Sequence, residues 1–596
     1  MSAFAADPDY LTETRRLMAE AQAALERGDL AGSADGVLHV ARRHPSAAGG
    51  WVQAAAAGLR AGAAALALKA ARRAVLLDPA SPSAAALLTA ASPDEALASR
   101  HRATAFWALT HPGKAEALGA LASSYQSLGR SREAERVARD ALQADPNMAW
   151  VRVNLAVILR ESGREKEAET ELRRALLAGP DGNLAWRRMA ALAETLSKLE
   201  LADRAARRAL VIDAGDHVSS VFLSIVERRR GDLESARQRL QALPKALEGE
   251  AGRDAVEFEL GTVLDRLGRY DEAWAHFERG NEIAVQRAPS GTADPRLFVN
   301  TLNAYAGAVS DGWPARWVPL PEAEPPAVFM VGFPRSGTTL LDQILDAHPD
   351  ARVIEEQPVL SSVGAGFAAL GEGTLAERLA ALTEADADRL RAEYRAKLAR
   401  WAGEEGAGED RPRVVIDKMP LNIVYLPLAL RLYPNAKVIL SLRHPCDCCL
   451  SCFMQSIRLN SAMASFTSME GAAGFYARVM ALWQQIEQVL SPDHITVRYE
   501  DLVADTEGTA RRAVDFLGLD WTDAVLDHTA HAKSRGMIRT PSFRQVSEPI
   551  YTRAVGRWAR YRNQMAPHLD TLAPYTEHFG YGDPRAIPRG DDESQG

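Results

Sequence analysis

Cysteine is scarce in this sequence, and positive charge is not in excess. Four cysteines in 596 residues are too few for a disulfide framework, so the composition indicates a reducing compartment. The formal net charge of −8 argues against nucleic acid or an anionic membrane as a partner held by bulk charge. The cysteine count therefore favours a cytoplasmic location.

Long apolar runs are missing as well. The most apolar early stretch, "AGAAALALKAARRAVLL", is interrupted by Lys69, Arg72 and Arg73, whereas a membrane-spanning helix needs about 18 or more apolar residues in succession. The first residues have no apolar core preceded by basic residues, so we expect neither a secretory signal nor a membrane span. Hydrophobic residues still make up 47% of the chain, enough for sizeable cores.

A regular spacing of prolines is present in the first half of the chain. Five prolines lie 34, 33, 34 and 34 residues apart, at Pro45, Pro79, Pro112, Pro146 and Pro180. Residues 127–146, "SLGRSREAERVARDALQADP", and residues 161–180, "ESGREKEAETELRRALLAGP", have the same order of features. Each has a turn glycine, an acidic residue, a small alanine, an amphipathic helix and a terminal proline.

This period resembles that of the tetratricopeptide repeat, a helix–turn–helix unit. We expect seven or eight units over about 10–285, with the third and sixth turn glycines missing or replaced. A generic alanine-rich helical bundle is the alternative, and five prolines in one phase argue against it. Stacked repeats make a concave surface that usually binds a peptide or protein partner.

The composition changes after the repeats. Residues 286–326 are rich in proline and predict a connector, and residues 581–596 predict a polar tail. Between them, residues 327–580 have an α/β pattern. The apolar run "AVFMVGF" predicts a buried parallel strand, and "RSGTTLLDQILDAHP" predicts a helix after it.

The turn between this strand and helix, within "FMVGFPRSGTT", is similar to a phosphate-binding loop that lacks its lysine. Gly332 and Gly337 have the P-loop spacing, but Thr338 stands where nucleotide-hydrolysing loops have lysine, which disfavours a kinase or other NTPase. Arg335 lies inside the loop instead. Its planar guanidinium and the hydroxyls of Ser336, Thr338 and Thr339 suit a short diphosphate-like group.

Three further segments follow in order. In "KVILSLRHPCDCCLSCF" a strand ends at Arg443, and Ser451 lies two helical turns later, so both side chains can reach one phosphate. The other two segments are "TVRYEDLV" (496–503), which contains Tyr499, and "TPSFRQVSEPIYTRAVGRW" (540–558), which contains Ser542 and Arg557.

The four segments together resemble sulfotransferases that use 3′-phosphoadenosine 5′-phosphosulfate (PAPS). The resemblance covers about 327–575 and is greatest for protein-tyrosine sulfotransferases and for bacterial proteins that join tetratricopeptide repeats to such a domain. It implies an α-helical tetratricopeptide solenoid followed by an α/β, P-loop-like sulfotransferase domain with a parallel sheet. The loop, from Arg335 through Ser336, Gly337 and Thr338 to Thr339, would hold the 5′-phosphosulfate.

The resemblance also assigns the rest of the PAPS site. It implies that Arg443 and Ser451 hold the 3′-phosphate and that Tyr499 lies at the adenosine. Ser542 and Arg557 belong to a segment that folds over the nucleotide, and Arg557 replaces a lysine of the protein-tyrosine enzymes while keeping the charge.

Sulfuryl transfer needs a base for the acceptor proton and positive charge for the departing phosphate. "ARVIEEQPV" offers two glutamates, and because neighbours on an extended segment point to opposite sides, we expect only one to face the site. The resemblance places the catalytic base at Glu356, with Glu355 as the alternative. It makes Lys418, by itself a solvated strand end, the residue that stabilises the departing oxygen, and it gives Ser542 a hydrogen bond in the transition state.

The acceptor hydroxyl stays open among a tyrosine, a saccharide and a small metabolite. Pro358 and Gln455 stand where the protein-tyrosine enzymes have arginines, and Ile354 replaces a cysteine. We expect no metal, because the clustered cysteines have no second Cys/His pair and are typical of packing residues: Cys446, Cys448, Cys449 and Cys452.

The sequence therefore favours a cytoplasmic, PAPS-dependent sulfotransferase whose repeats recruit a protein partner. Two other functions are weighed against it: a tetratricopeptide adaptor with a degenerate nucleotide-binding domain, and an NTP-using P-loop enzyme. A homodimer is compatible with the sequence.

Overall fold

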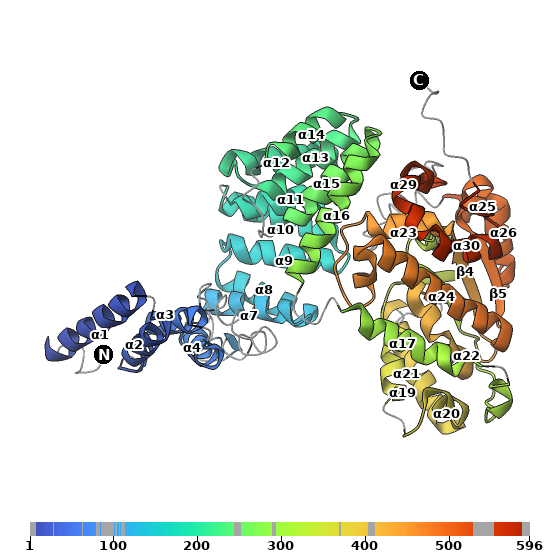
Figure 1. Cartoon of the computed structure of the whole chain (residues 1–596), viewed down its shortest axis with the longest axis horizontal. Coiled ribbons are helices and arrows are strands. Elements are labelled where there is room, and N and C mark those ends of the chain that lie inside the picture. Colours follow the sequence, from blue (N-terminus) through green and yellow to red (C-terminus); the bar gives the residue numbers. More distant parts are fainter. Residues whose placement is uncertain are drawn as a thin grey trace. The chain divides into compact units, whose positions relative to one another are not determined.

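The computed structural model describes most of the chain between Pro8 and Ala586. The described stretches are 8–78, 114–243, 252–288, 294–368, 371–402, 412–527 and 554–586, apart from positions 28, 44, 62, 181 and 311, together with isolated residues between 81 and 108. The chain falls into two compact units, Met1–Ala214 and Gly215–Gly596. Figure 1 colours the chain by residue number, so the elements of each unit can be followed in it.

The first unit consists of helix hairpins. Its described helices are α1 (Pro8–Glu26), α2 (Leu30–Arg43), α3 (Ala48–Arg60), α4 (Ala64–Leu77), α7 (Ala115–Ser127), α8 (Ser131–Ala144), α9 (Ala149–Glu161), α10 (Glu165–Ala178), α11 (Asn183–Thr195) and α12 (Leu199–Ile212). Helix α8 shows why the pairs form: its buried side chains, Ala134, Val137, Ala138 and Ala141, make one stripe at helical spacing. Small alanines in such stripes let paired helices approach closely.

The turns between paired helices need a left-handed residue. Gly129 and Gly163 supply it with φ of 71° and 74°, a conformation that glycine adopts without steric strain. At the sixth turn the residue is Ser197, which is forced into the same region with φ of 55°. The sixth turn glycine is thus replaced, as the sequence predicts, while the third falls outside the described residues.

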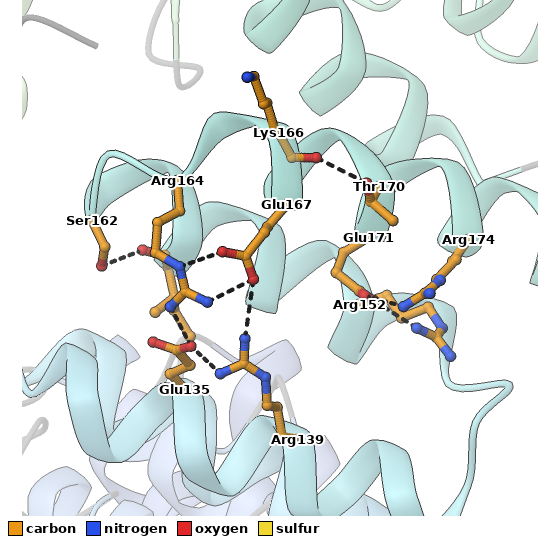
Figure 2. Close-up of polar contacts among 11 residues, drawn as sticks. Glu135, Arg139, Arg152, Ser162, Arg164, Lys166, Glu167, Thr170, Glu171 and Arg174 are labelled. Atoms are coloured by element: carbon orange, nitrogen blue, oxygen red, sulfur yellow. Dashed lines mark hydrogen bonds and ion pairs between the residues drawn. The ribbon is translucent and has the colours of Figure 1, made fainter. Parts of the chain in front are cut away.

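Ion pairs join successive repeats at equivalent positions. Glu135 of α8 lies 2.5 Å from Arg164, just before α10, and Arg164 also pairs with Glu167 at 2.6 Å (Figure 2). One repeat later, Glu169 pairs with Lys198 at 2.6 Å. Because the Glu135–Arg164 and Glu169–Lys198 pairs each link one repeat to the next, they fix the local stacking of the array.

The second unit begins with two more hairpins and a further helix: α13 (His217–Arg229), α14 (Leu233–Gln241), α15 (Arg253–Arg266), α16 (Tyr270–Arg287) and α17 (Pro295–Ala308). Together with the first unit, the described residues contain seven helix hairpins, which confirms the helical repeat array. A parallel sheet domain follows in the same unit.

The sheet has five parallel strands in the order β2-β3-β1-β4-β5, of which β4 and β5 are labelled in Figure 1. The strands are β1 (Val328–Gly332), β2 (Ala351–Glu355), β3 (Val414–Lys418), β4 (Lys437–Leu442) and β5 (Asp493–Arg498). Strand β1 is buried along its whole length, as a continuous apolar run in the middle of a parallel sheet predicts.

Helices cover both faces of the sheet. Val328 and Met330 of β1 belong to one apolar core with α18 (Thr338–Asp346) and α26 (Thr506–Phe516), whereas Phe329 and Val331 belong to a second core. The other helices that surround the sheet are α19 (Val359–Ala368), α20 (Leu375–Ala380), α21 (Glu384–Ala402), α22 (Leu426–Leu432), α23 (Pro445–Phe453), α24 (Met469–Leu490), α25 (Tyr499–Ala504), α29 (Arg562–Met565) and α30 (Leu569–His578). Among the described residues, every helix is too short or too polar to cross a membrane.

Candidate active site

The carboxyl ends of the strands meet at one edge of the sheet. Strand β1 pairs with β3 through Met330 and Lys418, and with β4 through Gly332 and Ser441. On the other side of β3, Lys418 pairs with Glu355 of β2. The segments that leave these strands therefore lie next to one another, at the edge where open α/β sheets bind their ligands.

The loop after β1 has the backbone of an anion-binding turn. Arg335 and Gly337 are both left-handed, with φ of 71° and 97°, and backbone turns of this kind gather N–H groups into a concavity for anions. A Cβ at Gly337 would lie 2.7 Å from the Tyr499 ring, and one at Gly332 would lie 2.4 Å from the Ser441 carbonyl oxygen. Close packing therefore requires glycine at both positions.

The polar side chains of this loop are buried beside α23. Arg335 Nε donates a hydrogen bond to the Ser451 hydroxyl at 3.1 Å. Ser336 is almost fully buried, and its hydroxyl has no hydrogen-bond partner among the described residues. Thr338 and Thr339 are buried at the first turn of α18, where the helix N-terminus favours negative charge.

Arg443 follows β4 and reaches the same loop. Its Nη1 donates to the Arg335 carbonyl oxygen at 3.3 Å, and its Nη2 lies 3.8 Å from the Asp447 carboxylate. The guanidinium carbon is 5.1 Å from the centre of the Tyr499 ring. Burial disfavours its charge, yet Asp447 and neighbouring groups raise the pKa of Arg443 above its ordinary value. Arg443, Tyr499 and the loop thus form one contiguous group.

Lys418 ends β3 and lies among three carboxylates. Its Nζ is 3.2 Å from Glu356 Oε1, 3.4 Å from Asp342 Oδ2 and 3.5 Å from Glu355 Oε1. The side chain is 0% exposed, so it is not a solvated strand end. Burial alone would lower the pKa of Lys418, but the carboxylates of Glu356, Asp342 and Glu355 raise it to about 12. The lysine therefore keeps its charge near neutral pH.

The expectation that only one of the two adjacent glutamates faces the site is wrong. Glu355 is the last residue of β2, and Glu356 takes a positive φ of 47° as the chain leaves the strand. The Glu356 N–H donates to the Lys418 carbonyl oxygen at 2.7 Å, which fixes this turn against β3. Strand alternation ends at Glu355, so both carboxylates reach Lys418. The Glu356 side chain is 33% exposed and that of Glu355 only 10%, which makes Glu356 the more accessible carboxylate.

The carboxy-terminal candidates are placed differently. Ser542 lies outside the described residues. Arg557 begins a short 3-10 helix, Arg557–Tyr561, and its Nη2 lies 2.7 Å from Asp265 Oδ2 of α15. Its role at the 3′-phosphate stays a prediction, as do the other roles assigned to the site residues.

Two buried carboxylates near the site were missed from the sequence. Asp342 of α18 faces Lys418, and Asp447 of α23 accepts hydrogen bonds from the Gly556 and Trp558 N–H groups, each at 2.8 Å. Burial raises the pKa of Asp447. Asp447 is the only charged residue in "CDCCLSC", and a lone charge in an apolar helix signals that it needs a partner. Asp342 carries no such signal.

The four clustered cysteines are buried along α23. Cys452 Sγ donates to the Pro334 carbonyl oxygen at 3.5 Å, so this helix packs directly under the loop. Burial raises the pKa of the Cys448 and Cys449 thiols, which disfavours the reactive thiolate. Within the part of the chain that the structure describes, no group of three or more His, Cys, Asp or Glu residues is placed to hold a metal ion.

Comparison with known proteins gives two family matches. Residues 326–523 match the Sulfotransferase family, and residues 127–194 match the Tetratricopeptide repeat. A protein-tyrosine sulfotransferase of Drosophila melanogaster is 28% identical over 287 residues, which cover 44% of this chain and 55% of the relative. An uncharacterized protein of Aquifex aeolicus is 27% identical over 350 residues, 56% of this chain and 42% of the relative.

The chain spans about half the length of these two relatives. Among solved structures, the sulfotransferase domain from the Synechococcus PCC 7002 olefin synthase is 24% identical, with a TM-score of 0.32 and coverage of 46% of this chain and 99% of that one. The chain therefore carries tetratricopeptide repeats together with a domain of the sulfotransferase family, and this domain is similar to protein-tyrosine sulfotransferases.

Proposed function

We propose that the chain is an enzyme that transfers a sulfuryl group from PAPS to an acceptor hydroxyl. The observation that carries this proposal is the convergence of three groups at one edge of the sheet: the Arg335 loop, the Lys418–Glu356 pair and Arg443. An anion-binding loop beside a charged lysine and an accessible carboxylate is what sulfuryl transfer requires.

Buried polar atoms without partners support a bound anion. Among the described residues, neither the Ser336 hydroxyl nor the Arg443 Nε has a hydrogen-bond partner. Leaving such groups unsatisfied costs about 1–3 kcal/mol each, and more for a charged group. A phosphosulfate at the loop and a 3′-phosphate near Arg443 would satisfy them, so the residues present fit PAPS. Arg335, Ser336, Gly337, Thr338 and Thr339 would hold the first group, and Ser451, Tyr499 and Arg557 complete the set assigned to the nucleotide.

The roles of the chain's own residues follow from burial and charge. PAPS, when bound, supplies the sulfuryl group. Glu356 is the accessible carboxylate and takes the proton of the acceptor hydroxyl. Lys418 stays charged, because its pKa is about 12, and its Nζ can donate to the oxygen that departs. Asp342 and Glu355 keep Lys418 in place when Glu356 engages an acceptor.

The acceptor and the partner belong to the same proposal. A protein tyrosine is one candidate acceptor, because relatives are named protein-tyrosine sulfotransferases. Saccharides and small metabolites stay as alternatives, because Pro358 and Gln455 replace two arginines of the protein-tyrosine enzymes. The repeats would recruit the protein that carries or delivers the acceptor. The proposed location is the cytoplasm.

Calorimetric binding tests the nucleotide site. We expect 3′,5′-diphosphoadenosine to bind more tightly than ATP or 5′-AMP, and Arg443→Ala to remove that preference. Arg511→Ala is the matched control, since Arg511 pairs with Glu507 on the exposed side of α26. Transfer of label from PAPS should be lost in Arg335→Ala and Glu356→Gln.

The alternatives give different results in the same assay. A preference for ATP would favour an NTP-using P-loop enzyme. Partner binding by the repeats with no nucleotide binding would favour an adaptor with a degenerate domain.

A further inference from the structure

The last described repeat hairpin, α15–α16, is built into the sheet domain within the second unit. Trp274 and Phe277 of α16 pack against Phe453 at the end of α23, with ring centres 4.7 Å and 6.5 Å apart. Tyr270 lies edge-on to Tyr561, 5.3 Å between ring centres. These contacts join the hairpin to the two segments that flank the proposed nucleotide site.

Asp265 makes the central polar contact of this junction. Its side chain is only 4% exposed, and its Oδ2 lies 2.7 Å from Arg557 Nη2. Its Oδ1 accepts hydrogen bonds from the Tyr561 hydroxyl at 2.7 Å and from Arg557 Nε at 3.4 Å. The carboxylate thus holds one edge of the guanidinium. The Arg557 side chain remains 26% exposed, so its other edge can still meet a ligand.

The backbone on either side of Arg557 is hydrogen-bonded to residues next to the proposed nucleotide site. Asp447 accepts the N–H groups of Gly556 and Trp558, and it lies 3.8 Å from Arg443. Arg443 also donates to the Ala554 carbonyl oxygen at 2.5 Å. Arg557 is therefore fixed between two buried carboxylates, Asp447 through its backbone neighbours and Asp265 through its side chain.

A second contact supports the helix that carries Ser451. Asn281 of α16 is buried, and its Nδ2 donates to the Phe453 carbonyl oxygen at the end of α23 at 3.0 Å. Thirteen residues after the turn position this hairpin has asparagine, whereas six other copies have apolar residues there: Ala41, Val75, Leu142, Leu176, Leu210 and Pro244. This copy thus differs from the others at a position that contacts α23.

We propose that Asp265 of the last repeat hairpin is a positioning residue for the nucleotide site, which it serves by holding the Arg557 guanidinium toward the 3′-phosphate. The proposal rests on the proposed function, because it takes Arg557 as a ligand of that phosphate. Removing a carboxylate that orients a metal-binding side chain typically lowers affinity about 10- to 100-fold, and we expect an effect at the lower end of that range for an arginine that binds phosphate.

The test compares nucleotides that differ only in the 3′-phosphate, using the full-length protein. The affinity ratio of 3′,5′-diphosphoadenosine to 5′-AMP is measured by calorimetry for wild type, Asp265→Asn, Arg557→Gln and the double variant. We expect Asp265→Asn to reduce the ratio about tenfold without weakening 5′-AMP, and the double variant to resemble Arg557→Gln. Glu259→Gln is the matched control, since Glu259 is a buried carboxylate on the same helix that pairs with Arg228 at 2.6 Å.

Each other result overturns the proposal in a recognisable way. An unchanged ratio in Asp265→Asn, with a reduced ratio in Arg557→Gln, would show that Asp265 does not position the arginine and would leave the proposed function standing. If Asp265→Asn and Glu259→Gln both lowered the affinity for the two nucleotides equally, the effect would be a general loss of structure and Asp265 would have no positioning role. A wild type without any preference for the 3′-phosphate would overturn the proposed function as well.

Discussion

Removing the charge of Lys418 tests the electrostatics of the site without any ligand. Its Nζ lies 3.2–3.5 Å from three carboxylates. At an effective dielectric constant of about 20, unit charges at these separations attract by about 5 kcal/mol per pair. Burial offsets much of this, because the rise in the pKa of Lys418 from 10.5 to about 12 corresponds to a net preference for the charged form of only about 2 kcal/mol.

Lys418→Met keeps most of the side-chain volume and leaves Asp342 and Glu355 buried without their countercharge. Breaking a buried ion pair by removing one partner costs about 3–5 kcal/mol, so we expect that loss in the free energy of unfolding at pH 8. Acid should relieve it, because the stranded carboxylates bind protons more readily in the folded state. The loss in the free energy of unfolding is absent below the pKa of these carboxyl groups in the unfolded chain, near 4, and it grows as pH rises. Wild type should not share this dependence between pH 5 and pH 8, because its carboxylates keep their countercharge and the raised pKa of Lys418 keeps the lysine charged throughout that range.

Urea unfolding at pH 5 and pH 8, at one ionic strength, measures the effect. Protection of the β3 amides against hydrogen exchange reports the second unit alone. Lys437→Met is the matched control, because Lys437 pairs with the exposed Asp493 at 3.1 Å and should lose under about 1 kcal/mol. Asp342→Asn added to Lys418→Met should recover part of the loss. An equal loss at both pH values, or a loss below about 1 kcal/mol at pH 8, would refute the reasoning.

Three further outcomes are expected. Ser197→Gly should raise the free energy of unfolding of the repeat unit by about 1 kcal/mol, because it removes the backbone strain of a serine at positive φ. Urea unfolding followed by helical circular dichroism measures this change. Burial raises the pKa of Asp417 to about 7, so ionisation of this carboxyl destabilises the fold. As pH rises from 4 to 7, the free energy of unfolding of Asp417→Asn should increase relative to wild type by on the order of 4 kcal/mol, as measured by unfolding at several pH values. Gly337→Ala should abolish calorimetric nucleotide binding through backbone strain and contact with Tyr499, whereas Gly518→Ala, at φ of 72° with open space around it, should not.

Much of the fold followed from local patterns in the sequence. A continuous apolar run gave β1, and the glycine turn with apolar positions after it gave α18. The repeat phase predicted the hairpins, and it identified the sixth turn as one of two turns without the usual glycine. These features depend on residues close together in the chain, so period and turn chemistry are sufficient to predict them.

The site was predicted less completely, because its geometry depends on contacts between distant residues. Asp265 and Arg557 are 292 residues apart, and no local pattern indicates that they pair. The two glutamates were misjudged because strand alternation does not extend past Glu355, and the left-handed Glu356 is fixed by the Lys418 carbonyl oxygen on another strand. Burial of Lys418 likewise depends on helices that cover the strand end.

The position of the boundary between the two units has a consequence for how such a chain can vary. The first unit ends at Ala214, so repeats before this point can be gained or lost by duplication while the second unit keeps all of its internal contacts. The hairpin α15–α16 does not have this freedom. A duplicate of α7–α8 or α9–α10 in its place would bring leucine instead of Asn281, and glutamine or arginine instead of Asp265. The Phe453 carbonyl oxygen and Arg557 would then lose these partners. Natural variation in repeat number should therefore be confined to the amino-terminal side, and chimeras that exchange repeat arrays should join at residue 214 rather than at the end of α16.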